Sequence, residues 1–207
     1  MMRIAAVAFS VLSVTTAIGA CNSATSGADT PAGGPAASVT TAPAVVTRVT
    51  RGEFSSTPSG GGGYTYDTEL VPEGATAELT LKAEEDRTNV RLSVTGLTPN
   101  HGYGAHLHTK PCGEDPDAAG PHYQNKPDPA AKDAPSTDPA YANSTNEVWL
   151  DFTADSLGDA TTSVQVPWVA TAKRRPNSLV IHAEQTMTEP GKAGTAGARV
   201  GCLTIAY

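Results

Sequence analysis

Alternation of apolar and polar residues with a period of two is the feature that most constrains the fold of this chain. Segments 75–81 and 89–95 alternate in this way and are separated by the charged turn 84–87, which is typical of a β-hairpin. Further segments with strand character are 103–108, 148–153, 161–166, 179–183 and 199–205. Because no helical periodicity is sustained beside them, we expect an all-β antiparallel sandwich or barrel.

The N-terminal part of the chain has a different composition. Residues 1–20 carry Arg3 as their one charge and an apolar run, which predicts a cleaved signal peptide. This segment ends Ile-Gly-Ala and is followed by Cys21. The four residues resemble the lipobox of bacterial lipoproteins, which predicts lipidation of Cys21; a chance cysteine after an ordinary signal is the alternative. The residues after it are mostly Ala, Ser, Thr, Pro and Gly, so we expect a flexible tether over 21–63. A first strand near 45–54 is possible within it, and the predicted domain covers 64–207.

The charge of the chain and the position of its apolar stretch each exclude one class of protein. Lys and Arg number 14 against 21 Asp and Glu, for a formal net charge of -7, and the one basic cluster is 173–175. Such a chain offers no surface that neutralises phosphates, so we exclude nucleic-acid binding. The long apolar stretch is N-terminal, which also excludes a polytopic membrane protein. An exported, turn-rich domain remains.

The placement of the histidines predicts a metal site. His106 and His108 flank one leucine, so on a strand both side chains project from the same face. His122 lies in a Gly-Pro-His sequence on a long loop, and His182 ends an apolar run. Four imidazoles can thus converge on one ion, although imidazole suits Cu, Zn, Fe and Ni alike. The fifth histidine, His101, lies in a turn and is interpreted as structural.

The cysteines indicate a cross-link. If Cys21 carries lipid, Cys112 and Cys202 are the two thiols that remain, and exported proteins usually pair such a couple. Their bridge would close a loop of about ninety residues. It would also fix the long loop that follows His108 to the last predicted strand.

Four blocks in order resemble the successive signatures of the copper/zinc superoxide dismutase family, over about residues 64–207. The blocks are His106-Leu-His108 with Cys112, Gly120-Pro-His122, Ser178-Leu-Val-Ile-His182 and Gly197-Ala-Arg199-Val-Gly-Cys202. The resemblance implies a Greek-key β-barrel of about eight strands with long metal-binding loops. It implies that copper is bound by His106, His108, His122 and His182. It also implies an intrasubunit disulfide between Cys112 and Cys202, and it makes Arg199 the cation that guides superoxide. If copper binds here, reduction lowers the charge at the metal and raises the basicity of a released imidazole, so we expect His122 to carry the proton.

The chain departs from this family where zinc would bind. No histidine lies between His122 and His182, although in the family two further histidines and an aspartate there complete the zinc site. Carboxylates without imidazole or thiolate make a weak zinc site, and the aspartates in that stretch are Asp128, Asp133 and Asp138. The pattern is similar to the copper-only branch, in which a carboxylate supports the formerly bridging imidazole. Glu147 lies about where that carboxylate would be, and an exposed acid at a strand edge is the alternative. Zinc binding is therefore doubtful.

The resemblance implies a copper-dependent superoxide dismutase that converts superoxide to O2 and hydrogen peroxide as copper cycles between Cu(II) and Cu(I). With a lipid anchor at Cys21, we expect it on the extracytoplasmic face of the cell membrane. The alternative is an envelope lipoprotein of the same fold that buffers or delivers copper without turnover, which needs the histidines but not Arg199. Monomer and homodimer both stay open.

Overall fold

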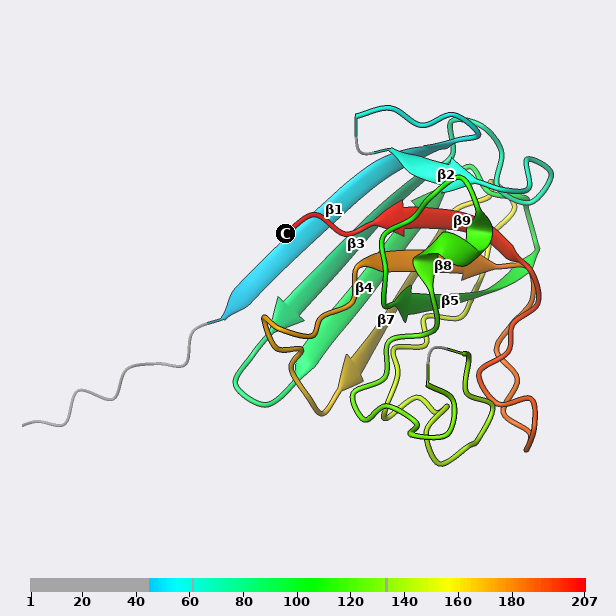
Figure 1. Cartoon of the computed structure of the whole chain (residues 1–207). Helices are drawn as coiled ribbons and strands as arrows, with labels where there is room; N and C mark the ends of the chain where they lie inside the picture. The colour runs from blue at the N-terminus through cyan, green and yellow to red at the C-terminus, as the bar shows by residue number, and fades with distance from the viewer. Residues whose placement is uncertain (1–44, 61, 133) are drawn as a thin grey trace, which may run out of the picture. The chain divides into compact units, whose positions relative to one another are not determined.

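Nine strands form one strongly curved β-sheet in the computed structural model, which describes residues 45–60, 62–132 and 134–207 (Figure 1). The strands are β1 (Val46–Ser55), β2 (Gly63–Thr65), β3 (Thr76–Ala83), β4 (Thr88–Thr95), β5 (Gly102–His108), β6 (Phe152–Thr153), β7 (Ala160–Val166), β8 (Ser178–His182) and β9 (Arg199–Thr204). Their order in the sheet is β6-β5-β8-β9-β2-β1-β3-β4-β7, and the two end strands are in contact. The expected all-β Greek-key barrel is confirmed.

The barrel encloses one main hydrophobic core. In β4, Val90, Leu92 and Val94 point inward and are about 1% exposed, whereas the residues between them are partly or fully exposed. β3 pairs with β4 over its whole length, and β4 pairs with β7. The period-two pattern therefore buries one face of each strand, as predicted.

The first strand lies inside the range that the sequence analysis gave mainly to the tether. β1 pairs with β3 from Val46 to Glu53, so the sheet begins before residue 64. The strand that the sequence analysis allowed near 45–54 is therefore present. The predicted signal peptide, Cys21 and the tether as far as residue 44 lie outside the described residues. No helix in the described ranges is long and apolar enough to cross a membrane.

The strand expected over 148–153 is much shorter than predicted. Regular pairing is limited to β6, while Trp149 makes an isolated bridge with His106. Between Glu147 and β6 the backbone keeps a hydrogen bond to β5, from the Leu150 N–H to the Ala105 carbonyl oxygen at 2.8 Å, without forming a regular ladder. The side chains of Glu147 and Trp149 bond each other in this stretch. A short 3-10 helix, η1 (Pro116–Ala119), was also not expected.

Two long loops cover the end of the sheet that carries the histidines. The first, 109–151, is fixed at its base by the disulfide between Cys112 and Cys202, with a Cα–Cα distance of 5.8 Å, so the predicted pairing is confirmed. The second, 183–198, crosses tightly over β5. A Cβ at Gly104 would lie 2.7 Å from the carbonyl oxygen of Glu184, so this close approach requires glycine.

Candidate metal centre

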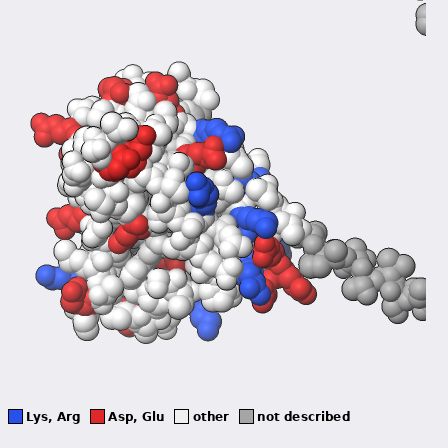
Figure 2. All heavy atoms as spheres, turned by 180° about the vertical axis from the view of Figure 1, so that it is seen from behind, with Lys and Arg blue, Asp and Glu red and all other residues white. Residues whose placement is uncertain are grey.

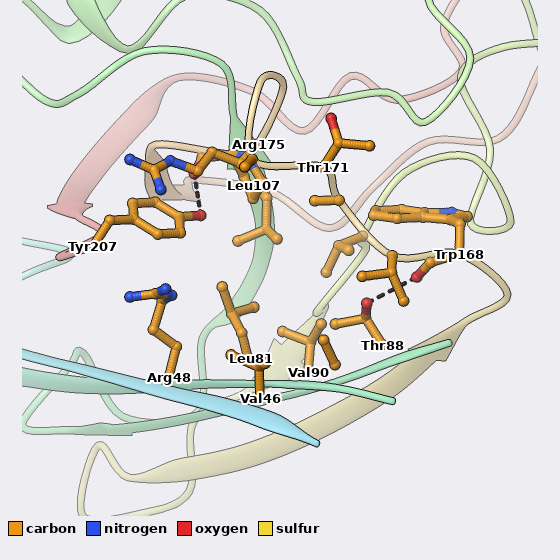
Figure 3. Close-up of a pocket in the computed structure, with 16 residues that line it drawn as sticks. Val46, Arg48, Leu81, Thr88, Val90, Leu107, Trp168, Thr171, Arg175 and Tyr207 are labelled. Carbon is orange, nitrogen blue, oxygen red and sulfur yellow. Dashed lines mark hydrogen bonds between the residues drawn. The ribbon is translucent and has the colours of Figure 1, made fainter. Parts of the chain in front are cut away.

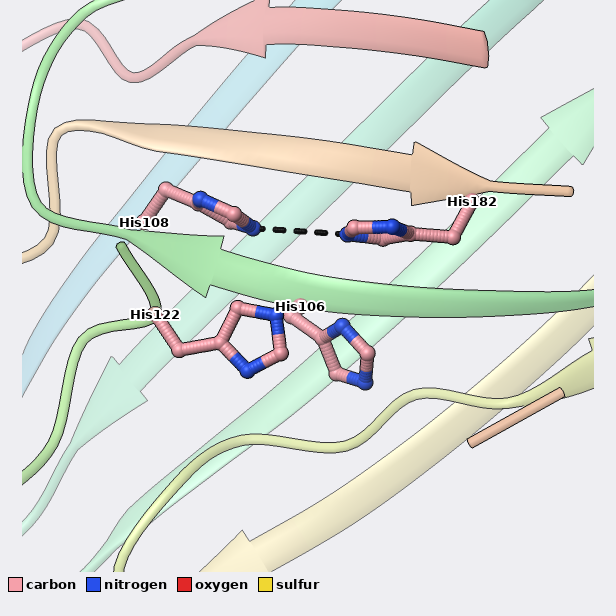
Figure 4. A group of neighbouring side chains, drawn as sticks. All are labelled: His106, His108, His122 and His182. Atoms are coloured by element: carbon pink, nitrogen blue, oxygen red, sulfur yellow. Dashed lines mark hydrogen bonds between the residues drawn. The ribbon is translucent and has the colours of Figure 1, made fainter. Parts of the chain in front are cut away.

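Two neighbouring strands and one loop bring the four predicted histidines together (Figure 4). His106 and His108 lie on one face of β5, and His182 ends β8, which pairs with β5. His122 comes from the first loop, through an isolated bridge with His108. One ring nitrogen from each lies within 4.8 Å of the others, and all but His122 are buried. His101 lies outside this cluster; its Nε2 contacts the carbonyl oxygen of Ala183.

Backbone carbonyl groups fix two of the imidazole rings. The Nδ1 of His108 lies 2.8 Å from the carbonyl oxygen of Gly120, and the Nδ1 of His182 lies 3.3 Å from that of Gly197. Since a carbonyl can only accept, each ring donates from Nδ1 and keeps its lone pair on Nε2. The two Nε2 atoms face each other at 3.5 Å.

Glu147 fixes the ring of His122. Its Oε2 lies 2.9 Å from His122 Nδ1 and accepts a second hydrogen bond from Trp149 Nε1 at 2.8 Å. Its Oε1 accepts a hydrogen bond from Gln124 Nε2 at 2.8 Å. The residue Glu147 as a whole is 1% exposed. Glu147 is thus a buried, fully hydrogen-bonded carboxylate that leaves the His122 lone pair on Nε2.

Thr186 and Asp151 fix the ring of His106. The Thr186 hydroxyl donates to Asp151 Oδ1 at 2.6 Å, so its oxygen accepts from His106 Nε2 at 2.7 Å. Asp151 also accepts from the backbone N–H of Thr186 at 2.8 Å. The sequence analysis missed both residues, because they are far apart in the chain and meet only through the path of the second loop. Trp149 was also missed, although its position two residues after Glu147 was a usable signal.

The four remaining nitrogens make a donor set that fits copper. His106 Nδ1 is buried and has no hydrogen-bond partner among the described residues, which is unusual for a polar atom. It faces the Nε2 atoms of the other three rings. The Nε2 atoms of His108 and His182 lie 3.5 Å apart, and the four ligand nitrogens lie within 4.8 Å of one another, close enough to share one metal ion. Imidazole ligands suit copper, zinc, iron and nickel, so this donor set accepts copper without selecting it.

The cluster is electrostatically prepared to bind a cation. Burial, followed by the neighbouring imidazoles, holds the pKa of His106 and of His108 well below 6.5. Burial likewise lowers the pKa of His182 to about 3. These three rings are therefore neutral at physiological pH, which is the form that coordinates metal.

Arg199 lies beside this cluster and is largely buried, with a side chain 15% exposed. Its guanidinium donates to the carbonyl oxygens of Pro116 and Gly120, both at 2.8 Å. The Gly120 carbonyl also accepts from His108, so one oxygen connects the arginine to a metal-site imidazole. Asp117, an exposed acid, lies 3.7 Å away.

Asp128 and Asp138 of the first loop accept hydrogen bonds from groups within that loop. Asp128 accepts from Ser136 Oγ at 2.6 Å and from the Ala130 backbone at 2.8 Å, and Asp138 accepts from the Ala140 backbone. Asp133 lies outside the described residues. Within the described part of the chain, the four histidines are the one group of His, Cys, Asp and Glu that could hold a metal ion.

A curved β-sheet with four converging histidines and an internal disulfide defines a metal-binding β-barrel protein. The family model described as copper/zinc superoxide dismutase matches residues 74–205. The chain therefore belongs to the copper/zinc superoxide dismutase family.

Solved structures are similar in fold. The Cu/Zn superoxide dismutase from Brucella abortus matches with a TM-score of 0.50 and 18% identity, covering 79% of this chain and 100% of that one. A double mutant of a SOD-like protein from Bacillus subtilis matches with a TM-score of 0.46 and 16% identity, covering 63% of this chain and 89% of that one. Comparison with curated protein sequences finds no match.

Proposed function

We propose that this chain is a copper-dependent superoxide dismutase. Two superoxide anions and two protons would become O2 and hydrogen peroxide, and copper held by His106, His108, His122 and His182 would supply the one-electron oxidation and reduction. The observation that carries the proposal is the shared Gly120 carbonyl, which holds the Arg199 guanidinium next to the histidine cluster. A protein that only stores copper has no need of a largely buried cation beside its ligands.

The side chains around the cluster would act on the substrate and its proton. Arg199 attracts the anion by charge and hydrogen bonding, and so offsets the repulsion expected from a net charge of -7. His122 would carry the proton on Nε2 only while that nitrogen is not bound to copper, and Glu147 would keep Nδ1 hydrogen-bonded throughout. The ring of His122 is suited to this role because its side chain is 15% exposed, whereas His106 and His108 are fully buried.

We further propose that copper is the one metal required. In a site that bridges copper and zinc, His122 Nδ1 would be a zinc ligand, but here that atom contacts Glu147 at 2.9 Å. Asp128 is engaged with Ser136 and with backbone N–H groups. Both observations favour a carboxylate in place of zinc behind His122.

The cellular location is part of the proposal. A lipid-anchored enzyme on the extracytoplasmic face of the cell membrane would remove superoxide that arrives from outside, because the anion crosses membranes poorly. Labelling cells with radioactive palmitate tests this. The full-length protein should take up label, and a Cys21→Ala variant should not; label retained in that variant contradicts the anchor.

Kinetics of an Arg199→Ala variant separate the enzyme from the alternative, a copper-buffering protein. We expect the second-order rate constant for dismutation to fall about tenfold and to lose much of its salt dependence, while copper stays bound. Arg199→Lys should recover part of the rate. Arg87→Ala, which removes an exposed arginine paired with Asp86, is the matched control and should leave the rate unchanged.

Electron paramagnetic resonance of bound copper completes the test. Because Arg199 and His108 share one carbonyl acceptor, loss of the guanidinium could disturb the ligands themselves. An unchanged copper spectrum with slower turnover supports substrate guidance. Tight copper binding by the wild-type protein with no turnover would instead establish the buffering protein.

A further inference from the structure

Figure 3 shows a cavity that is lined in part by β5. Its volume is about 250 Å³, and its lining is mainly apolar, including Leu81, Val90 and Trp168. Leu107 also lines it, and this residue lies between His106 and His108 on β5, so its side chain points to the opposite face. The cavity is therefore separate from the histidine cluster.

Two arginines and a tyrosine form the mouth of this cavity. The ring of Tyr207 lies between Arg48 of β1 and Arg175 of the segment before β8, as Figure 3 shows. The guanidinium carbons lie 4.5 Å and 3.6 Å from the ring centroid, and the tyrosine hydroxyl donates to the Pro176 carbonyl. Such cation–π contacts fix the planes of the guanidinium groups.

The edges of both guanidinium groups remain available. Within residues 45–60, 62–132 and 134–207, neither Arg48 nor Arg175 has an ion pair or a side-chain hydrogen bond. Each carries five N–H donors in a fixed fork, and both residues are partly buried.

The charge around the mouth is the reverse of that of the whole chain. None of the side chains lining the cavity is acidic, although the chain carries a net charge of -7. Acidic groups are spread widely over the face seen in Figure 2. Two cations beside an apolar cavity, with no acid lining it, are complementary to an anion that carries an apolar body.

We propose that this cavity binds an alkyl chain with a terminal carboxylate. The chain would fill the apolar space between Leu81, Val90 and Trp168, and the carboxylate would accept hydrogen bonds from Arg48 and Arg175 at the mouth. A volume of about 250 Å³ is just below that of most drug-sized sites, roughly 300–1,000 Å³, and so suits a single chain. The proposal is independent of the chemistry at the histidine cluster.

Calorimetric titration of the full-length protein with decanoate, below its micelle concentration, tests the proposal. We expect saturable binding with one site. Decanol keeps the chain without the charge and should bind about tenfold more weakly. Decyltrimethylammonium has the wrong charge, acetate lacks the chain, and neither should bind detectably.

Two variants locate the ligand. The double variant Arg48→Gln and Arg175→Gln should weaken decanoate binding at least about tenfold. Arg51→Gln is the matched control, because Arg51 lies on β1 as well but is exposed and paired with Glu78; it should bind as the wild type does. Ala83→Phe narrows the cavity and keeps both arginines, and it should also abolish binding. Near-ultraviolet circular dichroism checks that each variant is folded.

Several results would overturn the proposal. Equal affinity for decanoate and decanol would remove the role of the arginines, and equal losses in Arg51→Gln and in the double variant would place the anion elsewhere. If decanoate does not bind, a free alkyl carboxylate is not the occupant of the cavity. The same conclusion holds if decanoate does not bind but anionic phosphatidylglycerol vesicles do.

Discussion

The two halves of the sheet are built in different ways. In the hairpin half, formed by β1, β3, β4 and β7, long strands pair in continuous registers and bury alternate residues. In the site half, formed by β5, β8, β9 and the loops 109–151 and 183–198, strands are short and almost wholly buried. The hairpin half depends on backbone ladders and its core side chains. The site half has shorter ladders and depends in addition on individual side-chain bonds and one disulfide.

This difference shows how loops without regular secondary structure can be held in place around a metal site. Ser178 and Asn177 donate to the carbonyl oxygens of Lys110 and Thr109, both at 2.7 Å, and the backbone of Cys112 donates to Thr204 at 3.0 Å. Each bond satisfies a loop backbone group that a strand would have paired. We therefore expect disturbances of the two halves to have separable effects on stability and on copper binding.

Removal of the disulfide should have the largest effect. Cys112 and Cys202 are separated by 90 residues, and loss of such a bridge costs about 4 kcal/mol of unfolding free energy. We expect this loss in the double Cys→Ser variant, with weaker copper binding because the first loop loses its fixed base. Urea unfolding and a copper titration measure both. A variant as stable as wild type would show that the hydrogen bonds suffice.

A cavity introduced by substitution in the hairpin half should lower the free energy of unfolding and leave copper affinity unchanged. Leu92→Ala truncates a side chain that is 1% exposed in β4, which should cost about 3 kcal/mol. Below its unfolding transition, the variant should bind copper with the wild-type dissociation constant. If copper affinity falls as it does without the disulfide, the two halves are not separable.

Loss of the carboxylate charge that contacts His122 should mainly weaken metal affinity. Glu147→Gln keeps the shape of the side chain but removes the carboxylate that contacts His122 Nδ1. Such changes to the partner of a ligand typically weaken metal affinity about 10–100-fold. Competition with a chelator measures it, and Glu78→Gln, at an exposed acid of β3, is the control. Equal affinities in both variants would remove the role given to Glu147.

The smallest expected effect lies within the first loop. The hydrogen bond from Ser136, followed by those from backbone N–H groups, lowers the pKa of Asp128 below 3.8. The stability linked to this shift is present above about pH 3.8, the unfolded value, and is lost as the pH falls through the folded pKa. Ser136→Ala should raise the pKa of Asp128 toward 3.8, as measured by a nuclear magnetic resonance titration. An unchanged pKa would show that the backbone bonds alone hold the carboxylate.

The sequence predicts the hairpin half better than the site half, for a physical reason. Alternation over 75–81 and 89–95 follows directly from one buried face, so β3 and β4 were expected. The histidines were expected to meet because two of them flank one leucine. In contrast, the contact between Thr186 and Asp151 depends on how the second loop crosses β5, which no local pattern records. The shortness of β6 and the mouth formed by Tyr207 depend on the same kind of long-range packing.

One experiment tests the central claim most directly. The full-length protein is reconstituted with copper alone and with copper plus zinc, and the metal content and the rate of superoxide dismutation are measured in both preparations. We predict one copper per chain, no retained zinc and the same activity in both preparations. Dismutation that requires zinc would contradict the copper-only proposal, and bound copper with no turnover would contradict the enzyme itself.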